Sequence, residues 1–181
     1  SALAGAISTG IGDLGVDSDG DGDRIGAMDG RGNFVDPHRI MALALRYLVE
    51  ERDWRGPVVR TVSTTRMIDR LAAKYDLPVY ETPVGFNYIA DHMLKEDILI
   101  GGEESGGISF RGNIPEGDGS LMGLLLIEMV AASGTSLYEL VQSLLEEVGP
   151  AFYERDDLRL SHPVAKDRMV QLLLEEAPDR D

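Results

Sequence analysis

The stretch Pro57-Val58-Val59-Arg60-Thr61-Val62 decides the fold class, because it is a short β-branched segment between two helical patterns. Before it, Pro37 stands at a first-turn position, and apolar residues recur at helical spacing up to Leu48. After it, Thr64 or Thr65 can cap a second amphipathic helix. This order of helix, strand and helix is typical of an α/β domain.

The same alternation continues towards the C-terminus. Residues 77–80 and 98–100 form strand-like apolar runs, and residues 84–94 between them have helical spacing. Because the strands are continuously apolar and lie between amphipathic helices, they predict a parallel-type sheet covered on both faces. A looped segment follows at 101–119, and two more helices are predicted at 120–132 and 136–148.

The two ends of the chain differ from this central pattern. Residues 1–12 have no convincing period, and the segments around residues 17–24 predict a β-loop-β-turn-β piece rather than a complete domain. An extended segment is expected at 152–160 and an amphipathic helix at 163–176. We therefore predict an α/β fold, a three-layer αβα domain with a mostly parallel mixed sheet at 36–150, flanked by partial domains at 1–35 and 151–181.

Composition excludes several classes of function. The 181 residues carry a formal charge of −15, and no cluster of Lys and Arg is present, so nucleic acid is not expected as a partner. The chain has no cysteine and hence no disulfide framework. No signal peptide is found in the given chain, so a cytoplasmic protein is expected. The most apolar run, 121–132, includes Glu128 and is too short to span a bilayer, so no membrane partner is expected.

The loop Asp17-Ser18-Asp19-Gly20-Asp21-Gly22-Asp23-Arg24 is the strongest chemical signal in the chain. Alternating carboxylates in a turning loop can converge on one hard cation, and magnesium prefers such oxygen ligands. The glycines let the backbone curl and add little bulk near the ion. Without a cation, carboxylates this close would repel one another, so the loop predicts a divalent-cation site.

An EF-hand is one alternative for this loop, since Asp17-x-Asp19-x-Asp21-Gly22 matches its opening. The twelfth position, however, is Met28 where the bidentate glutamate should stand, and the eighth is Arg24 where an apolar residue is usual. The flanking segments are also strand-like instead of helical. The EF-hand interpretation therefore fails.

The segment Asp19-Gly20-Asp21-Gly22-Asp23-Arg24 resembles the D-G-D-x-D-R loop of the α-D-phosphohexomutases, the phosphoglucomutase/phosphomannomutase superfamily. In that family the three aspartates ligate magnesium, a phosphoserine oxygen takes a remaining position, and the arginine lies beside the phosphate. The resemblance implies Mg²⁺ as cofactor, Asp19, Asp21 and Asp23 as ligands, and Arg24 as the catalytic residue at the phosphate. Asp17 lies outside the match and is interpreted as an ordinary loop carboxylate. The alternative role for Arg24 is a salt bridge that holds the loop together.

A second polar loop, Gly102-Glu103-Glu104-Ser105-Gly106, follows the predicted strand at 98–100. A strand end that opens into a glycine-flanked polar loop is where ligands bind in open α/β sheets. The segment resembles the G-E-x-S-G sugar-binding loop of the same family, which implies that Glu103 and Ser105 bind sugar hydroxyls. Glu104 falls at the variable position of that motif. A polar turn with a capping role is the alternative.

A third segment, Thr82-Pro83-Val84-Gly85-Phe86-Asn87, resembles a family stretch that ends in a lysine, a candidate proton-transfer group. Asn87 cannot act as a general acid or base at neutral pH, so this role is unassigned. The three histidines, His38, His92 and His162, have no recognisable partner motif. Ser133-Gly134-Thr135 lacks the flanking arginine, glutamate and proline of the family's phosphate-binding loop.

The resemblance spans the end of the family's second domain, its third domain and the start of its fourth. No T-A-S-H-N-P-like serine loop and no R-x-S-G-T-E-P-like phosphate loop is present in the chain. We therefore expect a fragment of a phosphohexomutase that acts on glucose or mannose phosphates, needs the missing domains of its own chain, and is inactive alone. A metal-stabilised module that binds a sugar or a protein without catalysis is the alternative, and a hydrolase with an aspartate nucleophile is a weaker one.

Overall fold

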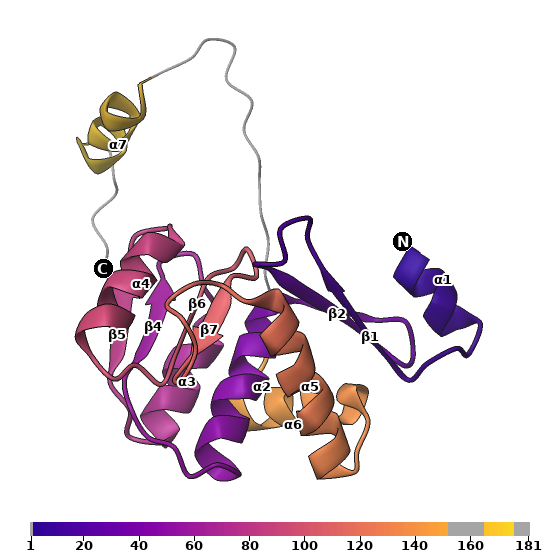
Figure 1. The fold of residues 1–181 in the computed structure, drawn as a ribbon. Helices are drawn as coiled ribbons and strands as arrows, with labels where there is room; N and C mark the ends of the chain where they lie inside the picture. The colour runs from indigo at the N-terminus through magenta and orange to yellow at the C-terminus, as the bar shows by residue number, and fades with distance from the viewer. Residues whose placement is uncertain (1, 152–164, 176–181) are drawn as a thin grey trace. The chain divides into compact units, whose positions relative to one another are not determined.

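The computed structural model describes residues 2–151 and 165–175, and the chain divides into two compact units, Ser1–Ala151 and Phe152–Asp181. The first unit holds two sheets and six helices among its described residues (Figure 1). The described element of the second unit is α7 (Lys166–Glu175), which falls within the predicted helix at 163–176. The predicted extended segment at 152–160 lies outside the described residues.

The larger sheet has the strand order β5-β4-β6-β7. β4 (Val58–Thr61) pairs in parallel with β5 (Val79–Thr82) and with β6 (Ile100–Gly102). β7 (Ile108–Phe110) pairs antiparallel with β6, so that Gly101 lies opposite Ser109. The mixed, mostly parallel sheet is confirmed, but the prediction of a loop throughout 101–119 is wrong. β7 has three residues, too few for a periodic pattern, and its pairing partner defines it.

Helices cover both faces of this sheet, as the three-layer prediction requires. α4 (Phe86–Lys95) packs on one face, where Val59, Ile89 and Ile98 form a small buried cluster. The other face contributes Val58 and Leu99 to the main core. That core is shared with α2 (Pro37–Glu50), α3 (Met67–Lys74), α5 (Gly119–Ser133) and α6 (Leu137–Val148).

Local capping explains where several of these helices begin and end. Asp36 accepts a hydrogen bond of 3.0 Å from the Arg39 amide ahead of α2. Ser136 and Glu139 form a reciprocal capping box at the start of α6. The prediction that Thr64 or Thr65 caps α3 is wrong in position, since the N-cap is Arg66 and makes no side-chain capping bond. The Thr65 hydroxyl nevertheless accepts from the Met67 amide at 3.2 Å.

Arg60 is the largest buried polar side chain of the larger sheet and is 1% exposed. From β4 it donates to both carboxylate oxygens of Asp69 in α3, at 2.7 and 2.8 Å. It also donates to Glu81 in β5 at 2.8 Å. A buried guanidinium needs such partners, because an unpaired charge in the interior is costly.

The smaller sheet has the order β1-β2-β3 and is antiparallel throughout. It comprises β1 (Leu14–Ser18), β2 (Ile25–Asp29) and β3 (Phe34–Val35), as the predicted β-loop-β-turn-β piece required. Both α1 (Ala2–Ser8) and α5 contact β1 and β2. The helix α1 was not predicted; its Leu3 side chain packs on Gly15, a tertiary contact that has no local signature.

Among the described residues, no single helix is long and apolar enough to cross a membrane. α5 and α6 taken together satisfy the length and composition of a span, but the pair bends by 87° between them. Six residues of α5 are buried inside the fold.

Candidate functional site

The acidic loop connects β1 to β2 and brings three carboxylates together. One carboxylate oxygen from each of Asp19, Asp21 and Asp23 lies within 4.8 Å of the other two. Gly22, at φ +79°, donates its amide to the Asp19 carbonyl at 3.3 Å and so closes the turn. Asp17 belongs to β1, where it pairs with Gly26. The prediction that Asp17 is a loop residue is therefore wrong.

Arg24 forms an ion pair inside the same loop. Its Nε lies 2.5 Å from one oxygen of Asp19, and its backbone amide donates to the other oxygen at 3.2 Å. Loss of hydration alone would raise the pKa of Asp19, but these bonds outweigh it and hold that pKa at about 2. The salt bridge that was the alternative role for Arg24 is therefore present. Its side chain is nevertheless 52% exposed, so its terminal nitrogens can still meet an anion.

Asp23 provides a test of whether a cation fits the loop. Its Oδ1 is buried and accepts no hydrogen bond from any described residue, although Arg24 Nε lies 3.5 Å away. Loss of hydration and the negative charges of Asp19 and Asp21 raise the pKa of Asp23. The three carboxylates, with one oxygen each within 4.8 Å of the others, would hold a hard cation such as Mg²⁺, which prefers oxygen ligands. The donor set fits a hard divalent cation.

The second polar loop joins β6 to β7, and its side chains are held in place by hydrogen bonds. Glu103 accepts from the backbone amide of Gly85 at 2.8 Å and from the Ser105 hydroxyl at 3.2 Å. The Glu103 amide donates to the Gly107 carbonyl at 2.9 Å and closes the loop. Through Gly85, the segment that ends in Asn87 is tied to the same glutamate. Asn87 itself is exposed in the first turn of α4.

The two loops meet directly. Ile25, which follows the acidic loop, donates its amide to the Gly106 carbonyl at 3.2 Å, and Arg24 forms an isolated antiparallel bridge with Gly107. A cavity of about 460 Å³ lies at this junction. Asp19, Arg24 and Ser105 line it, together with apolar residues of β2. The structure thus brings one predicted metal ligand, the predicted phosphate residue and one predicted sugar residue to the same cavity, whereas Asp21, Asp23 and Glu103 do not line it.

Glu104 has a structural role that was not predicted from the sequence. Its carboxylate accepts from the hydroxyls of Ser63 at 2.6 Å and Thr61 at 3.2 Å, so it ties the second loop to the end of β4. Thr61 is in turn within 2.8 Å of the Thr64 hydroxyl. The available signal was the run of hydroxyl residues at the carboxyl end of a predicted strand, where parallel sheets place their ligand-binding loops.

The two described histidines, His38 and His92, do not line the cavity at this junction. His38 Nδ1 accepts a hydrogen bond from the Thr65 amide at 3.3 Å, and burial lowers the pKa of His38. His92 stacks on Tyr80 with ring centroids 5.0 Å apart. His162 lies outside the described residues.

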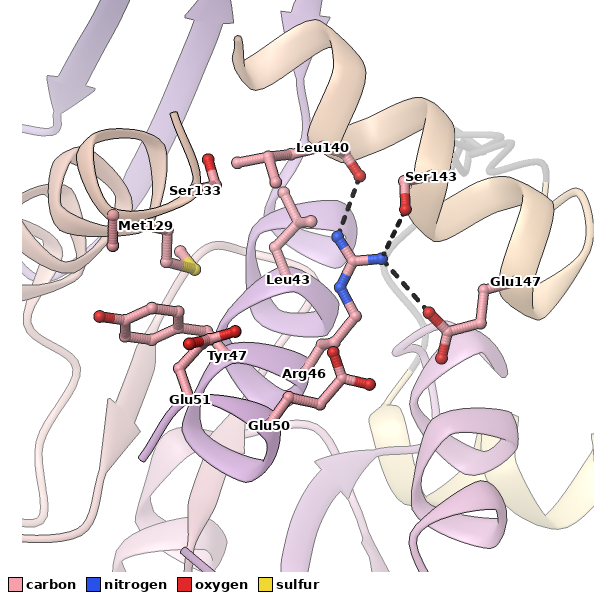
Figure 2. A pocket seen from close by; sticks show the side chains of 11 residues that line it. Leu43, Arg46, Tyr47, Glu50, Glu51, Met129, Ser133, Leu140, Ser143 and Glu147 are labelled. Atoms are coloured by element: carbon pink, nitrogen blue, oxygen red, sulfur yellow. Dashed lines mark hydrogen bonds and ion pairs between the residues drawn. The ribbon is translucent and has the colours of Figure 1, made fainter. Parts of the chain in front are cut away.

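A second cavity, of about 290 Å³, lies between α2, α5 and α6 and contains none of the predicted site residues. Figure 2 shows Arg46 reaching from α2 across it to α6. The guanidinium donates to the Leu140 carbonyl, to Ser143 and to Glu147, each at 3.2–3.3 Å. Arg46 therefore links α2 to α6 through these hydrogen bonds.

Comparison with known proteins identifies the family. Residues 36–148 match the family model described as phosphoglucomutase/phosphomannomutase, alpha/beta/alpha domain III. The chain belongs to the phosphoglucomutase/phosphomannomutase family. Among curated members of this family, the phosphoglucosamine mutase of Carboxydothermus hydrogenoformans is 36% identical over 132 residues, which cover 72% of this chain and 30% of that enzyme. The phosphoglucosamine mutase of Corynebacterium aurimucosum is 37% identical over 139 residues, 75% of this chain and 31% of that enzyme.

Solved structures agree with this family assignment. A crystal structure of a putative phosphomannomutase from Thermus thermophilus has a TM-score of 0.77 and 35% identity, over 82% of this chain and 34% of that one. The N-acetylphosphoglucosamine mutase of Aspergillus fumigatus, solved with GlcNAc-6P and magnesium, shares the fold at a TM-score of 0.58 and 19% identity, over 71% of this chain and 34% of that one. This chain therefore spans about a third of the length of the family members that it matches.

Proposed function

We propose that this chain carries the metal-binding and sugar-binding loops of a phosphohexomutase, an enzyme that moves a phosphoryl group between positions 1 and 6 of a hexose. The observation that carries the proposal is the junction of the two loops, where the Ile25 amide bonds to the Gly106 carbonyl beside a shared cavity. The remaining catalytic groups, a phosphoserine included, are proposed to come from further domains of the same polypeptide.

Asp19, Asp21 and Asp23 would hold Mg²⁺, because their carboxylates already converge. When bound, Mg²⁺ supplies positive charge against the phosphate that is transferred. Arg24 keeps its Nε on Asp19 and offers its exposed terminal nitrogens to the phosphate oxygens. Planar guanidinium groups are well suited to this contact, since they donate two parallel hydrogen bonds to a phosphate.

Glu103 and Ser105 would bind the sugar. Glu103 is oriented by the Gly85 amide and the Ser105 hydroxyl, so its carboxylate is preorganised to accept hydrogen bonds from sugar hydroxyls. Asn87 can donate or accept hydrogen bonds at neutral pH but cannot transfer a proton, and so it is proposed to contact substrate without acting as acid or base.

The substrate is proposed to be a hexose phosphate: a glucose, mannose or glucosamine phosphate. Glucose and mannose follow from the family resemblance of the two loops. Glucosamine phosphate is added because the curated relatives reported above are phosphoglucosamine mutases. An amino group on the sugar would be a suitable donor to the Glu103 carboxylate.

The metal assignment is tested by titrating the 181-residue chain with Mn²⁺, followed by electron paramagnetic resonance, with Mg²⁺ as competitor. Asp21→Ala is expected to weaken Mn²⁺ binding at least about tenfold, since a carboxylate ligand is lost. Asp17→Asn is the matched control, because Asp17 lies in β1 outside the convergent group, and it should bind Mn²⁺ like the wild type. Equal affinity in Asp21→Ala and the wild type would sink the metal assignment.

The sugar assignment is tested by NMR titration with glucose 6-phosphate, mannose 6-phosphate and glucosamine 6-phosphate in the presence of Mg²⁺. Shift changes are expected at residues 103–107 and 24–25, and Glu103→Gln should weaken them. Glu146→Gln is the control, since Glu146 is an exposed residue of α6 and does not line the cavity at the junction. Shift changes confined to residues remote from both loops would contradict the proposal.

A further inference from the structure

The N-terminus of α5 lies directly against the acidic loop. Gly119, the first residue of the helix, donates its amide to the Gly22 carbonyl at 2.9 Å. Asp118 caps the helix by accepting from the Leu121 amide at 2.8 Å, and its own amide donates to the Ile108 carbonyl at 3.1 Å. A carbonyl of the acidic loop thus satisfies one of the amides that a helix leaves unpaired at its start.

Gly117 and Gly119 allow the backbone at the start of α5 to lie close to the backbone of the acidic loop. A Cβ atom on Gly119 would lie closer than 3.0 Å to the Arg24 carbonyl oxygen and 3.1 Å from that of Gly22. A Cβ atom on Gly117 would lie 2.7 Å from the Asp23 carbonyl oxygen. Neither glycine has a positive φ, so the turn geometry does not require them. What requires them is the space occupied by the backbone of the acidic loop.

Gly20, within the acidic loop itself, shows the contrast. A Cβ atom on Gly20 would meet no atom within 4 Å, and its φ is not positive. An alanine at position 20 therefore has room and a permitted backbone. Close packing therefore requires glycine at positions 117 and 119, around the start of α5, and not at position 20.

We propose that Gly117 and Gly119 are positioning residues for the metal loop: they seat the carbonyls of Gly22, Asp23 and Arg24 and thereby set the affinity of the loop for its cation. This inference rests on the proposed metal function. The curvature of the acidic loop brings Asp21 and Asp23 together, and the contacts of that loop with Gly117 and Gly119 maintain the curvature. The partial positive charge at the start of α5 also offsets repulsion among the aspartates.

The test compares single variants of the 181-residue chain by Mn²⁺ titration. Gly119→Ala is expected to raise the Mn²⁺ dissociation constant at least about tenfold, equivalent to about 1.4 kcal/mol. Gly117→Ala should act in the same direction. Gly5→Ala is the control and should remain within about twofold of the wild type, because Gly5 lies in α1 outside both loops and a Cβ atom there would meet nothing within 4 Å. Trp54 fluorescence and a thermal melt without metal check that each variant is folded.

A folded Gly119→Ala that binds Mn²⁺ like the wild type would overturn the inference while leaving the metal site intact. A wild-type chain that binds no Mn²⁺ would overturn both. If Gly119→Ala does not fold, amide hydrogen exchange on the wild type decides. The Gly119 amide should exchange more slowly when Mn²⁺ or Mg²⁺ is bound, because the bound metal restricts the motion of the loop that carries its acceptor, the Gly22 carbonyl. Unchanged exchange at metal saturation would contradict the inference.

Discussion

The backbone amide of Ile25 donates a hydrogen bond of 3.2 Å to the carbonyl oxygen of Gly106. Ile25 directly follows the acidic loop, and Gly106 directly follows Ser105 in the polar loop between β6 and β7. One loop cannot shift relative to the other without breaking this bond. The residues proposed to bind the metal and the sugar are therefore held close to one another by this bond, an arrangement that suits the proposed function.

Gly106→Ala is expected to disrupt this junction. Gly106 has φ +105°, and a Cβ atom there would lie 2.8 Å from the Ile25 carbonyl oxygen. We expect a loss of about 2–3 kcal/mol in the free energy of unfolding, together with weaker hexose-phosphate binding. Urea unfolding and NMR titration measure the two effects.

Gly112→Ala is the control for this substitution. Gly112 also has a positive φ, +89°, but a Cβ atom there would meet nothing within 4 Å. It should cost about 1 kcal/mol from backbone strain and leave ligand binding unchanged. Equal effects of the two variants on ligand binding would argue against a special role of the junction.

Arg60→Met is expected to destabilise the larger sheet, because it leaves Asp69 and Glu81 without their buried partner. The carboxylates are 31% and 44% exposed and regain some hydration, so the expected loss is about 2–3 kcal/mol in urea unfolding. Arg66→Met is the matched control. Arg66 contacts the same two carboxylates at 3.4 and 3.6 Å but is 68% exposed, and its loss should cost less than about 1 kcal/mol. Equal losses in both variants would be the contrary result.

The stability of the chain is expected to fall in acid partly through Glu147. Burial would raise the pKa of Glu147, but hydrogen bonds from Lys74 at 2.5 Å and Arg46 at 3.3 Å outweigh it and lower the pKa below its ordinary value of 4.5. In the folded state the group therefore binds fewer protons than in the unfolded chain. Its contribution to stability is complete above pH 4.5 and is lost as the pH falls through the folded value.

Glu147→Gln should accordingly reduce the slope of unfolding free energy against pH below 4.5, measured by urea denaturation at successive pH values. Glu146→Gln is the neighbouring control, since Glu146 forms no ion pair with any described residue. It should keep the wild-type slope. A Glu147→Gln profile parallel to that of the wild type would disprove this role of the ion pairs.

The isolated 181 residues are expected to show no turnover of glucose 1-phosphate in a coupled mutase assay with Mg²⁺. The physical reason is that the serine that carries the phosphoryl group is proposed to lie in another domain of the polypeptide. A complete family enzyme serves as the positive control. Turnover that depends on Mg²⁺ and disappears in Asp21→Ala would refute this expectation.

Patterns in the sequence predicted the helices whose apolar residues recur over several turns, and the strands that alternate with those helices. The helices α2, α5 and α6 and the parallel pairing around β4 followed from such patterns and from capping residues. α1 and β7 did not, because each depends on a contact with a distant segment. Leu3 of α1 packs on Gly15, and Ile108 of β7 pairs with Gly102.

The sequence by itself determined the chemistry of the site: three alternating carboxylates, an arginine, and a glutamate and a serine flanked by glycines. Only the tertiary structure decided how these groups are held. The Gly85 amide orients Glu103, the hydroxyls of Ser63 and Thr61 anchor Glu104, and Gly119 supports the acidic loop. The reason is that these hydrogen bonds join backbone and side-chain groups far apart along the chain, and no local pattern of residue types encodes a close approach between two such segments.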